Sequence, residues 1–255
     1  MGLRTKIKKF LYIRKFSKKK YLTNINKKNI LITGANSGIG LALTKRLLEL
    51  DNKVLAIYRK NSQNLTNIKD SNLSIIKYDL RKINNFENFE NKIKETSIDL
   101  ILNCAGVFGP SFENQQIESL DFEKFQEVLM VNSISILKII QIILNNKLSK
   151  KNLEILVNIS SDAGSIDLNK EGNAYMYRAS KTALNSITKN MSIDLMARFK
   201  TIVFAIDPGN VQSGMNPGGT LKADVCANLI INLISSNVRL LNGKFVNLLG
   251  DELPW

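Results

Sequence analysis

The segment AYMYRASK, residues 174–181, carries two tyrosines and a lysine at a spacing that can support proton transfer. Tyr177 precedes Lys181 by four residues, and residues four apart share one face of an α-helix. Tyr175 has no such pairing with the lysine. Tyrosine alone, with a pKa of about 10, is a poor base, and a nearby cation favours its ionised form. We therefore expect Tyr177 to act in general acid–base catalysis and Tyr175 to pack in the core or against a substrate.

Three glycines, at 34, 38 and 40, lie in the stretch TGANSGIG, residues 33–40. The stretch follows the apolar run NILIT (29–33) and opens a segment with helical periodicity. A glycine-rich turn at this place lets a cofactor phosphate approach the backbone at a helix N-terminus. A turn that serves packing alone is the alternative, but its place at the first strand-to-helix turn favours binding.

Two cations, Arg59 and Lys60, follow the second apolar run, KVLAIY (53–58). In dinucleotide-binding folds an acid at this place binds the ribose 2′-hydroxyl of NAD, whereas a cation suits the 2′-phosphate of NADP. We expect NADP to be the preferred cofactor, with NAD as a possible one. A solvated basic loop is the alternative in a chain this rich in lysine.

Small and polar residues follow the next apolar runs. Ligands of open α/β sheets bind outside the carboxyl ends of the strands. The stretch NISSDAG (158–164) ends one such run, and its serines could present a hydroxyl to a substrate or form a plain cap. The ends of the two preceding apolar runs supply the candidate cofactor-lining residues Asp79, Asn103, Ala105 and Gly106. Each of these four residues could also be an ordinary turn or helix-cap residue.

Apolar runs alternate with helical patterns along the chain, which predicts a parallel sheet covered on both faces. The fold class expected is α/β, a single-domain, Rossmann-type, doubly wound parallel sheet of about seven strands. Strands are predicted at 29–33, 53–58, 73–78, 98–103, 153–160, 201–206 and 244–249, and helices at 40–50, 84–96, 117–146, 174–199 and 221–236.

Composition excludes several kinds of site. The chain of 255 residues has no histidine, which removes Ser-His-Asp and Cys-His catalysis and argues against a zinc site, so no metal is expected. The two cysteines, Cys104 and Cys226, are too few for a disulfide framework and are predicted to be buried free thiols. No apolar run is judged long enough to span a membrane.

The net charge of +14 belongs mostly to the first 28 residues, which hold eleven of the 36 basic residues and no acid. The rest is close to neutral, which disfavours a nucleic-acid-binding protein. We therefore expect a basic N-terminal extension, residues 1–28, before a domain at 29–255. Leu3, Ile7, Phe10 and Leu11 form a rough helical stripe among the cations, which suits an anionic membrane surface. A disordered or targeting extension is the alternative.

Taken together, these marks resemble the short-chain dehydrogenase/reductase family. The resemblance covers residues 29–255, and its motifs occur in the family's order. The segments YRASKTALN and GKFVNLLGDELPW resemble the C-factor and sniffer-type carbonyl reductase branch. The motifs are TGANSGIG, NCAG (103–106), VNS with Asn132, SSDAG, YRASK and DPGNV (207–211).

The resemblance implies a role for each of four residues. Tyr177 would protonate the carbonyl oxygen as hydride arrives, and Lys181 would hold the nicotinamide ribose and lower the tyrosine pKa. Ser161 would orient the carbonyl group, and Asn132 would hold a water molecule in the proton relay. These four residues are the predicted catalytic set.

The resemblance also implies the cofactor contacts. Ser213 stands where the family often has a threonine that contacts the nicotinamide carboxamide, and it keeps the hydroxyl. Gly214 stands where the branch more often has an acid. Contacts are expected from Gly34, Asn36, Ser37, Gly38, Ile39, Gly40, Arg59, Asp79, Leu80, Asn103, Ala105, Gly106, Tyr177, Lys181, Pro208, Gly209, Val211 and Ser213.

The function expected is that of an NADP-dependent oxidoreductase of carbonyl reductase type, which transfers hydride between NADPH and a small carbonyl or alcohol substrate. The alternative is an NAD(P)-binding signalling or regulatory protein with weak turnover. The resemblance implies a homodimer or homotetramer through the helices near 117–146 and 174–199. We expect a cytoplasmic protein that could contact a membrane peripherally through residues 1–28.

Overall fold

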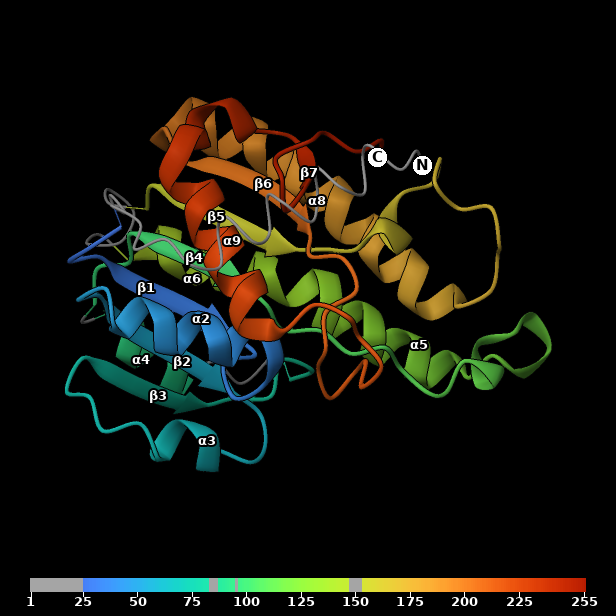
Figure 1. Ribbon diagram of the computed structural model, residues 1–255, viewed down its shortest axis with the longest axis horizontal. Helices are drawn as coiled ribbons and strands as arrows, with labels where there is room; N and C mark the ends of the chain where they lie inside the picture. The colour runs from blue at the N-terminus through green and yellow to red at the C-terminus, as the bar shows by residue number, and fades with distance from the viewer. Residues whose placement is uncertain (1–24, 83–86, 95, 147–152) are drawn as a thin grey trace.

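The computed structural model describes residues 25–82, 87–94, 96–146 and 153–255. Within them, seven parallel strands form one sheet in the order β3-β2-β1-β4-β5-β6-β7, with helices on both faces (Figure 1). This confirms the predicted fold class. The strands are β1 (Asn29–Thr33), β2 (Lys53–Tyr58), β3 (Leu73–Lys77), β4 (Leu100–Asn103), β5 (Ile155–Ile159), β6 (Ile202–Asp207) and β7 (Phe245–Asn247).

All seven strands lie where apolar runs predict them, because a strand buried on both faces must be apolar along its length. One face of the sheet packs against α2 (Gly38–Leu48) and α9 (Ala223–Asn237), which Figure 1 draws in front. The other face packs against α4 (Glu87–Lys94), α6 (Ser135–Asn145) and α8 (Tyr175–Phe199). The core therefore lies in two layers, one on each face of the sheet.

The long helix predicted over 117–146 is wrong as a single element. Two 3₁₀ turns, η1 (Glu113–Gln115) and η2 (Ile117–Ser119), precede α5 (Phe122–Leu129). The Asp121 side chain accepts a hydrogen bond from the Lys124 N–H at 3.0 Å, and this N-cap starts α5 after the predicted boundary.

A π turn, η3 (Met130–Ile134), separates α5 from α6. Its i→i+5 hydrogen bond runs from the Ser135 N–H to the Met130 carbonyl. The apolar period continues through the turn, so the pattern gave no sign of the interruption. π turns inside helices are frequent at functional sites, and this one holds Asn132. A short helix, α3 (Gln63–Thr66), was not predicted.

The last part of the predicted N-terminal extension packs on the sheet domain. Ile25 is buried in the core, and the Lys28 ammonium lies 2.7 Å from a carboxylate oxygen of Glu154. Residues 1–24, which carry most of the predicted extension, lie outside the described residues.

The stretch Phe122–Asn145 is, contrary to the expectation from sequence, long and apolar enough to cross a membrane by length and composition. Its most apolar window is 56% buried, and Ile136, Ile139 and Ile143 in α6 pack against the sheet. The apolar residues of this stretch therefore belong to the core of the domain. Both cysteines are free, as predicted, but only Cys226 is fully buried and Cys104 is partly exposed.

Candidate active site

The predicted site residues lie at the carboxyl edge of the sheet: at or just after the ends of β1 to β6, at the start of α2, in η3 and on α8. In Figure 1 the strand arrowheads point toward the side on which α5 projects. The chain leaves β1 toward β2 on one side and reaches β4 on the other, so the edge between β1 and β4 is the topological switch point. Doubly wound sheets bind their ligands at this point.

The glycine turn after β1 is too crowded for side chains. A Cβ on Gly40 would lie 2.3 Å from the Gly34 carbonyl oxygen, and a Cβ on Gly34, whose φ is +65°, would lie 2.9 Å from Ala105 Cα. The backbone of this turn is thus held against the end of β4. The Asn36 side chain donates to the Lys60 carbonyl oxygen at 2.7 Å, which joins the turn to the loop after β2.

A chain of buried polar side chains crosses the sheet beneath the site. The Thr33 hydroxyl donates to Asn103 Oδ1 at 2.8 Å, and the Asn103 amide donates to Asn158 Oδ1 at 2.9 Å. The Asn158 amide donates in turn to Thr188 Oγ1 of α8 at 2.9 Å. Asn103 therefore holds β1, β4 and β5 together with its side chain. Buried networks of this kind are rigid when every member is satisfied.

Asp79, after β3, is bound by an arginine that the sequence reasoning did not single out. Arg81 donates to both oxygens of the Asp79 carboxylate, with Nη2–Oδ2 at 2.6 Å and Nε–Oδ1 at 3.0 Å. The hydrogen bonds from Arg81 hold the pKa of Asp79 below its usual range, and the Arg59 charge acts in the same direction. Arg59 and Arg81 line one wall of a cleft of about 520 Å³. This cleft reaches Val107, after β4, and Val128, in α5.

Lys181 lies one helical turn after Tyr177 on α8 and is almost fully buried. Its Nζ donates to the Ile159 carbonyl oxygen at 2.9 Å and lies 5.8 Å from the centroid of the Tyr177 ring. Burial lowers the pKa of the Lys181 ammonium to about 8. A Cβ added to Gly106 would lie 3.6 Å from that Nζ, so the end of β4 closes over the lysine.

Tyr177 differs from the expectation in its acidity. Burial raises the pKa of its phenol, and the nearby carboxylates of Asp207 and Asp162 act in the same direction, so that the pKa is about 12. A hydrogen bond with Ser161 acts in the opposite direction. The expected lowering of the Tyr177 pKa by Lys181 is not found, because burial has the largest effect on the phenol and favours its neutral form. In this state Tyr177 is a proton donor rather than a tyrosinate.

Ser161 and Asn132 are both held firmly. The Ser161 hydroxyl donates to Asp162 Oδ1 at 3.0 Å and accepts from the Ala163 N–H at 3.1 Å. The buried Asn132 amide exchanges two hydrogen bonds with the Val107 backbone, at 2.8 and 2.9 Å. It also donates to Ser180 Oγ at 2.9 Å. These bonds place the π turn against the end of β4 and against α8.

The loop after β6, which carries Pro208 and Gly209, folds back over the glycine turn. A Cβ on Gly38, whose φ is +50°, would lie 3.3 Å from Ser213 Cβ. Val211 is buried in the core, so its backbone rather than its side chain faces the edge. The side chain of Leu80 is buried in the same way, and Ile39 packs partly into the core.

The structure thus brings Asn132, Ser161, Tyr177 and Lys181 together from three separate segments: η3, the loop after β5, and α8. Tyr175 lies outside this group and is 42% exposed, so the expectation that it packs in the core is wrong, and packing against a substrate stays a prediction. Contacts of Ser37, Ala105 and the other cofactor candidates with a bound nucleotide stay a prediction.

Comparison with known proteins gives a consistent result. A family model described as short chain dehydrogenase matches residues 28–222. The curated relatives include C-signal of Myxococcus xanthus, 30% identical over 160 residues, 62% of this chain and 93% of that protein. They also include the 3-oxoacyl-[acyl-carrier-protein] reductase FabG of Rickettsia prowazekii, 30% identical over 200 residues, 76% of this chain and 77% of that protein.

Among solved structures, the carbonyl reductase Sniffer of D. melanogaster superimposes with a TM-score of 0.81 at 27% identity. The match covers 90% of this chain and 100% of that one. Together with C-signal, it confirms the resemblance to the C-factor and sniffer-type branch.

Proposed function

The chain belongs to the short-chain dehydrogenase family of NAD(P)-binding oxidoreductases, and from this we propose that it is an NADPH-dependent reductase of small carbonyl compounds. The observation that carries the proposal is the convergence of Asn132, Ser161, Tyr177 and Lys181 beside the switch point of the sheet. A protein that only binds a nucleotide has no need of a hydrogen-bonded serine–tyrosine pair. A regulatory role without turnover is therefore not favoured.

Ser161 and Tyr177 would meet the substrate oxygen. The two hydroxyl groups interact, so a carbonyl oxygen could accept from Tyr177 and, once its hydrogen turns away from Asp162, from Ser161 as well. Negative charge develops on that oxygen during reduction, and two donors aimed at it stabilise the charge. Because its pKa is about 12, Tyr177 is protonated at neutral pH and can donate its proton to the new alcohol.

Lys181 and Asn132 would serve the cofactor side of the site. The ammonium of Lys181 points to the end of β4, beside Gly106, where it could bind a ribose hydroxyl. Asn132 would support a water molecule through the π turn, next to Ser180. A proton could then reach Tyr177 again after each turnover.

The residues at the sheet edge fit a dinucleotide. A Cβ at Gly34 or Gly40 would clash with neighbouring backbone, so the turn is closely packed, and helix α2 begins within it, at Gly38. Backbone N–H groups at a helix N-terminus suit a pyrophosphate. When bound, NADPH would supply the hydride. The exposed Arg59 supports a preference for NADPH over NADH, because it could pair with a 2′-phosphate.

The direct test is oxidation of NADPH in the presence of a panel of carbonyl compounds, including benzil and an acetoacetyl thioester. Consumption of NADPH that depends on the carbonyl compound supports the proposal. Tight NADPH binding with no turnover across the panel would favour the regulatory alternative.

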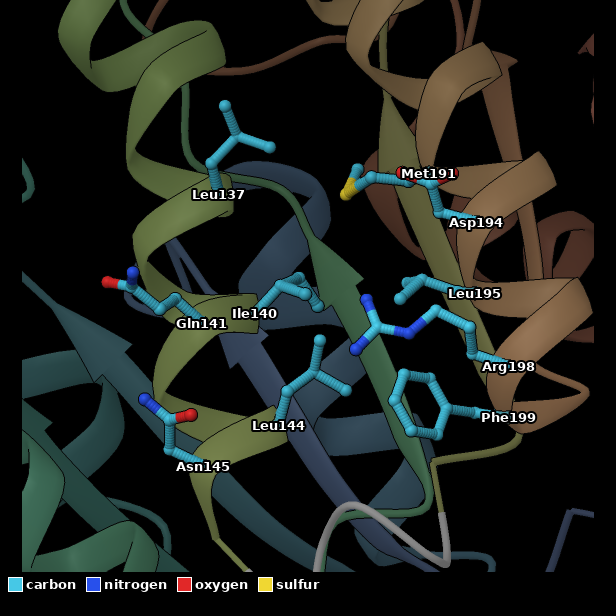
Figure 2. Close-up of a pocket in the computed structure, with 10 residues that line it drawn as sticks. All are labelled: Leu137, Ile140, Gln141, Leu144, Asn145, Met191, Asp194, Leu195, Arg198 and Phe199. Atoms are coloured by element: carbon cyan, nitrogen blue, oxygen red, sulfur yellow. The ribbon is translucent and has the colours of Figure 1, made fainter.

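We also propose that the protein forms a homodimer or homotetramer through helices α6 and α8. A groove of about 340 Å³ runs between these helices (Figure 2). Arg198, which lies 4.9 Å from the centroid of the Phe199 ring, points into it, and Leu137 beside it is 43% exposed. Sedimentation equilibrium should give at least twice the monomer mass.

Residues 1–28 lead us to propose a cytoplasmic protein in which a basic extension precedes a single domain and contacts anionic membrane surfaces. The support is in the sequence, which places nine cations and several apolar residues in the first 24 positions. Cations near an anionic surface each contribute about 1 kcal/mol of binding, so several together hold a protein reversibly.

A further inference from the structure

One side chain in the loop from Ser111 to Ser119 is buried, and it is a polar one. Gln115 is fully buried, whereas Phe112 is 52% and Ile117 is 63% exposed. Burial of apolar surface normally drives a loop onto a domain, so this arrangement is the reverse of the usual one. A buried amide costs free energy unless it is hydrogen-bonded, so the partners of Gln115 indicate its purpose.

The Gln115 amide joins three backbone groups. Its Nε2 donates to the Phe108 carbonyl oxygen at 2.9 Å and to the Pro110 carbonyl oxygen at 3.2 Å. Its Oε1 accepts from the Tyr177 N–H at 3.2 Å. Two carbonyls and one N–H fix the orientation of the amide, because only its nitrogen can donate and only its oxygen can accept.

Helix α8 has no cap of its own at this end. Its N-cap residue, Ala174, is in the left-handed conformation with φ of +47°, and no side chain of that residue can accept a hydrogen bond. Asn173 before it also has a positive φ, of +56°. The Tyr177 N–H lies in the first turn, where N–H groups have no partner within the helix. Gln115 Oε1 therefore does what an N-cap side chain usually does, from a distant loop.

The same amide fixes the wall that faces Tyr177. The Phe108 ring lies 5.1 Å from the Tyr177 ring, and the Phe112 ring stacks on Phe108 at 6.4 Å. Between the two carbonyls that bind Gln115 lies Gly109, with φ of +100°. The wall and the tyrosine thus share one support.

We propose that Gln115 is a positioning residue that sets Tyr177 relative to the aromatic wall formed by Phe108 and Phe112. The inference rests on the catalytic role proposed for Tyr177. Without the amide, the first turn of α8 loses its cap and the wall loses its two anchoring hydrogen bonds. The phenol then no longer holds one position toward the substrate carbonyl.

The first experiment replaces the amide without changing its length. Gln115→Met should raise amide hydrogen exchange in residues 107–112 and 174–180, and should lower kcat for a carbonyl probe such as benzil about tenfold to a hundredfold. NADPH affinity should change by less than about threefold, since the glycine turn is untouched. Gln116→Met makes the same change one residue along, at an exposed side chain, and should leave exchange and turnover unchanged.

A second variant separates positioning from packing. Gln115→Glu keeps the shape and the acceptor, but its ionised form cannot donate to the Phe108 carbonyl. Burial raises the pKa of a carboxyl group, so the protonated form returns as pH falls. The kcat of Gln115→Glu relative to the unaltered chain should therefore rise toward low pH. A residue that only fills space would give a constant ratio.

Hydrogen exchange and kcat in Gln115→Met equal to those in Gln116→Met would overturn the proposal. If Gln115→Met does not fold, a pH-independent kcat ratio for the folded Gln115→Glu variant overturns it instead. If the unaltered chain reduces no carbonyl probe, the proposed function fails. The exchange data then decide the role of Gln115 by themselves.

Discussion

Tyr177 and Lys181 lie one helical turn apart on α8, and the Lys181 Nζ is 5.8 Å from the centroid of the Tyr177 ring. Burial favours the neutral form of both side chains. It raises the pKa of Tyr177 to about 12 and lowers the pKa of Lys181 to about 8. The fold therefore keeps a lysine in a place where its charge is costly. This cost is expected at a functional site and has a measurable consequence.

Lys181→Met should change how stability depends on pH. In the unfolded chain Lys181 holds its proton up to its usual pKa of 10.5, whereas the folded chain releases it from about 8. The unaltered protein therefore gains stability as pH rises between these values, and the variant does not. We therefore compare the free energy of unfolding of the variant with that of the unaltered protein. The value for the variant minus the value for the unaltered protein should fall by about 2 kcal/mol from pH 7 to pH 10.

Urea unfolding at several pH values measures this difference. Lys53→Met removes an exposed lysine of β2 and is the control for the loss of one positive charge. A difference for Lys181→Met that stays constant with pH would contradict the effect of burial. Lys181→Met should also lose both turnover and NADPH affinity.

Arg59→Asp should reverse or flatten the cofactor preference. A charge-assisted contact with a 2′-phosphate contributes about 1.5–3 kcal/mol, or about one to two decades in affinity for NADPH. An aspartate at this place could bind the 2′-hydroxyl of NADH instead. Fluorescence titration with both cofactors measures the preference.

Lys53→Asp makes the same change of charge at the other end of β2 and should leave the preference intact. Equal affinity of the unaltered protein for NADH and NADPH would remove the basis for assigning NADP.

Some of the fold could be predicted because a single physical pattern determines it. The strands of a doubly wound sheet are buried on both faces, so their apolar runs gave all seven. The helix predicted over 117–146 failed because an apolar period passes unchanged through the π turn at Asn132. Asp121 is a good N-cap residue type and was the one signal of where α5 starts.

The site was predictable where a motif fixes it and not where tertiary contacts do. Tyr177 and Lys181 stand out by their spacing. Arg81 lies only two residues after Asp79, but the sequence does not show that its guanidinium turns back onto that carboxylate. Gln115, bound to Tyr177, carries no local signal, because its partner comes from another segment. The raised pKa of Tyr177 was missed for the same reason, since burial and the carboxylate of Asp207 are properties of the folded chain.

Removal of the basic extension should abolish membrane binding alone. A chain that begins at Asn24 keeps the buried Ile25 and the ion pair between Lys28 and Glu154, so it should fold, bind NADPH and turn over normally. It should no longer sediment with anionic phosphatidylserine vesicles. High salt should weaken binding of the full chain, because salt screens the attraction.

Neutral phosphatidylcholine vesicles are the control for this comparison. Equal sedimentation of the two chains with anionic vesicles, or none for either, would leave the extension as a disordered or targeting segment.

The most direct test of the proposed activity is the turnover of Tyr177→Phe beside that of Tyr175→Phe. The first change removes the phenolic proton donor and leaves the ring that packs on Phe108, so NADPH binding should persist. General acid catalysis contributes about 10²–10⁴-fold, and kcat for the reduction of a carbonyl compound should fall by that factor. Tyr175→Phe should stay within about threefold of the unaltered chain, because Tyr175 lies outside the catalytic group. A near-normal kcat for Tyr177→Phe would contradict the account.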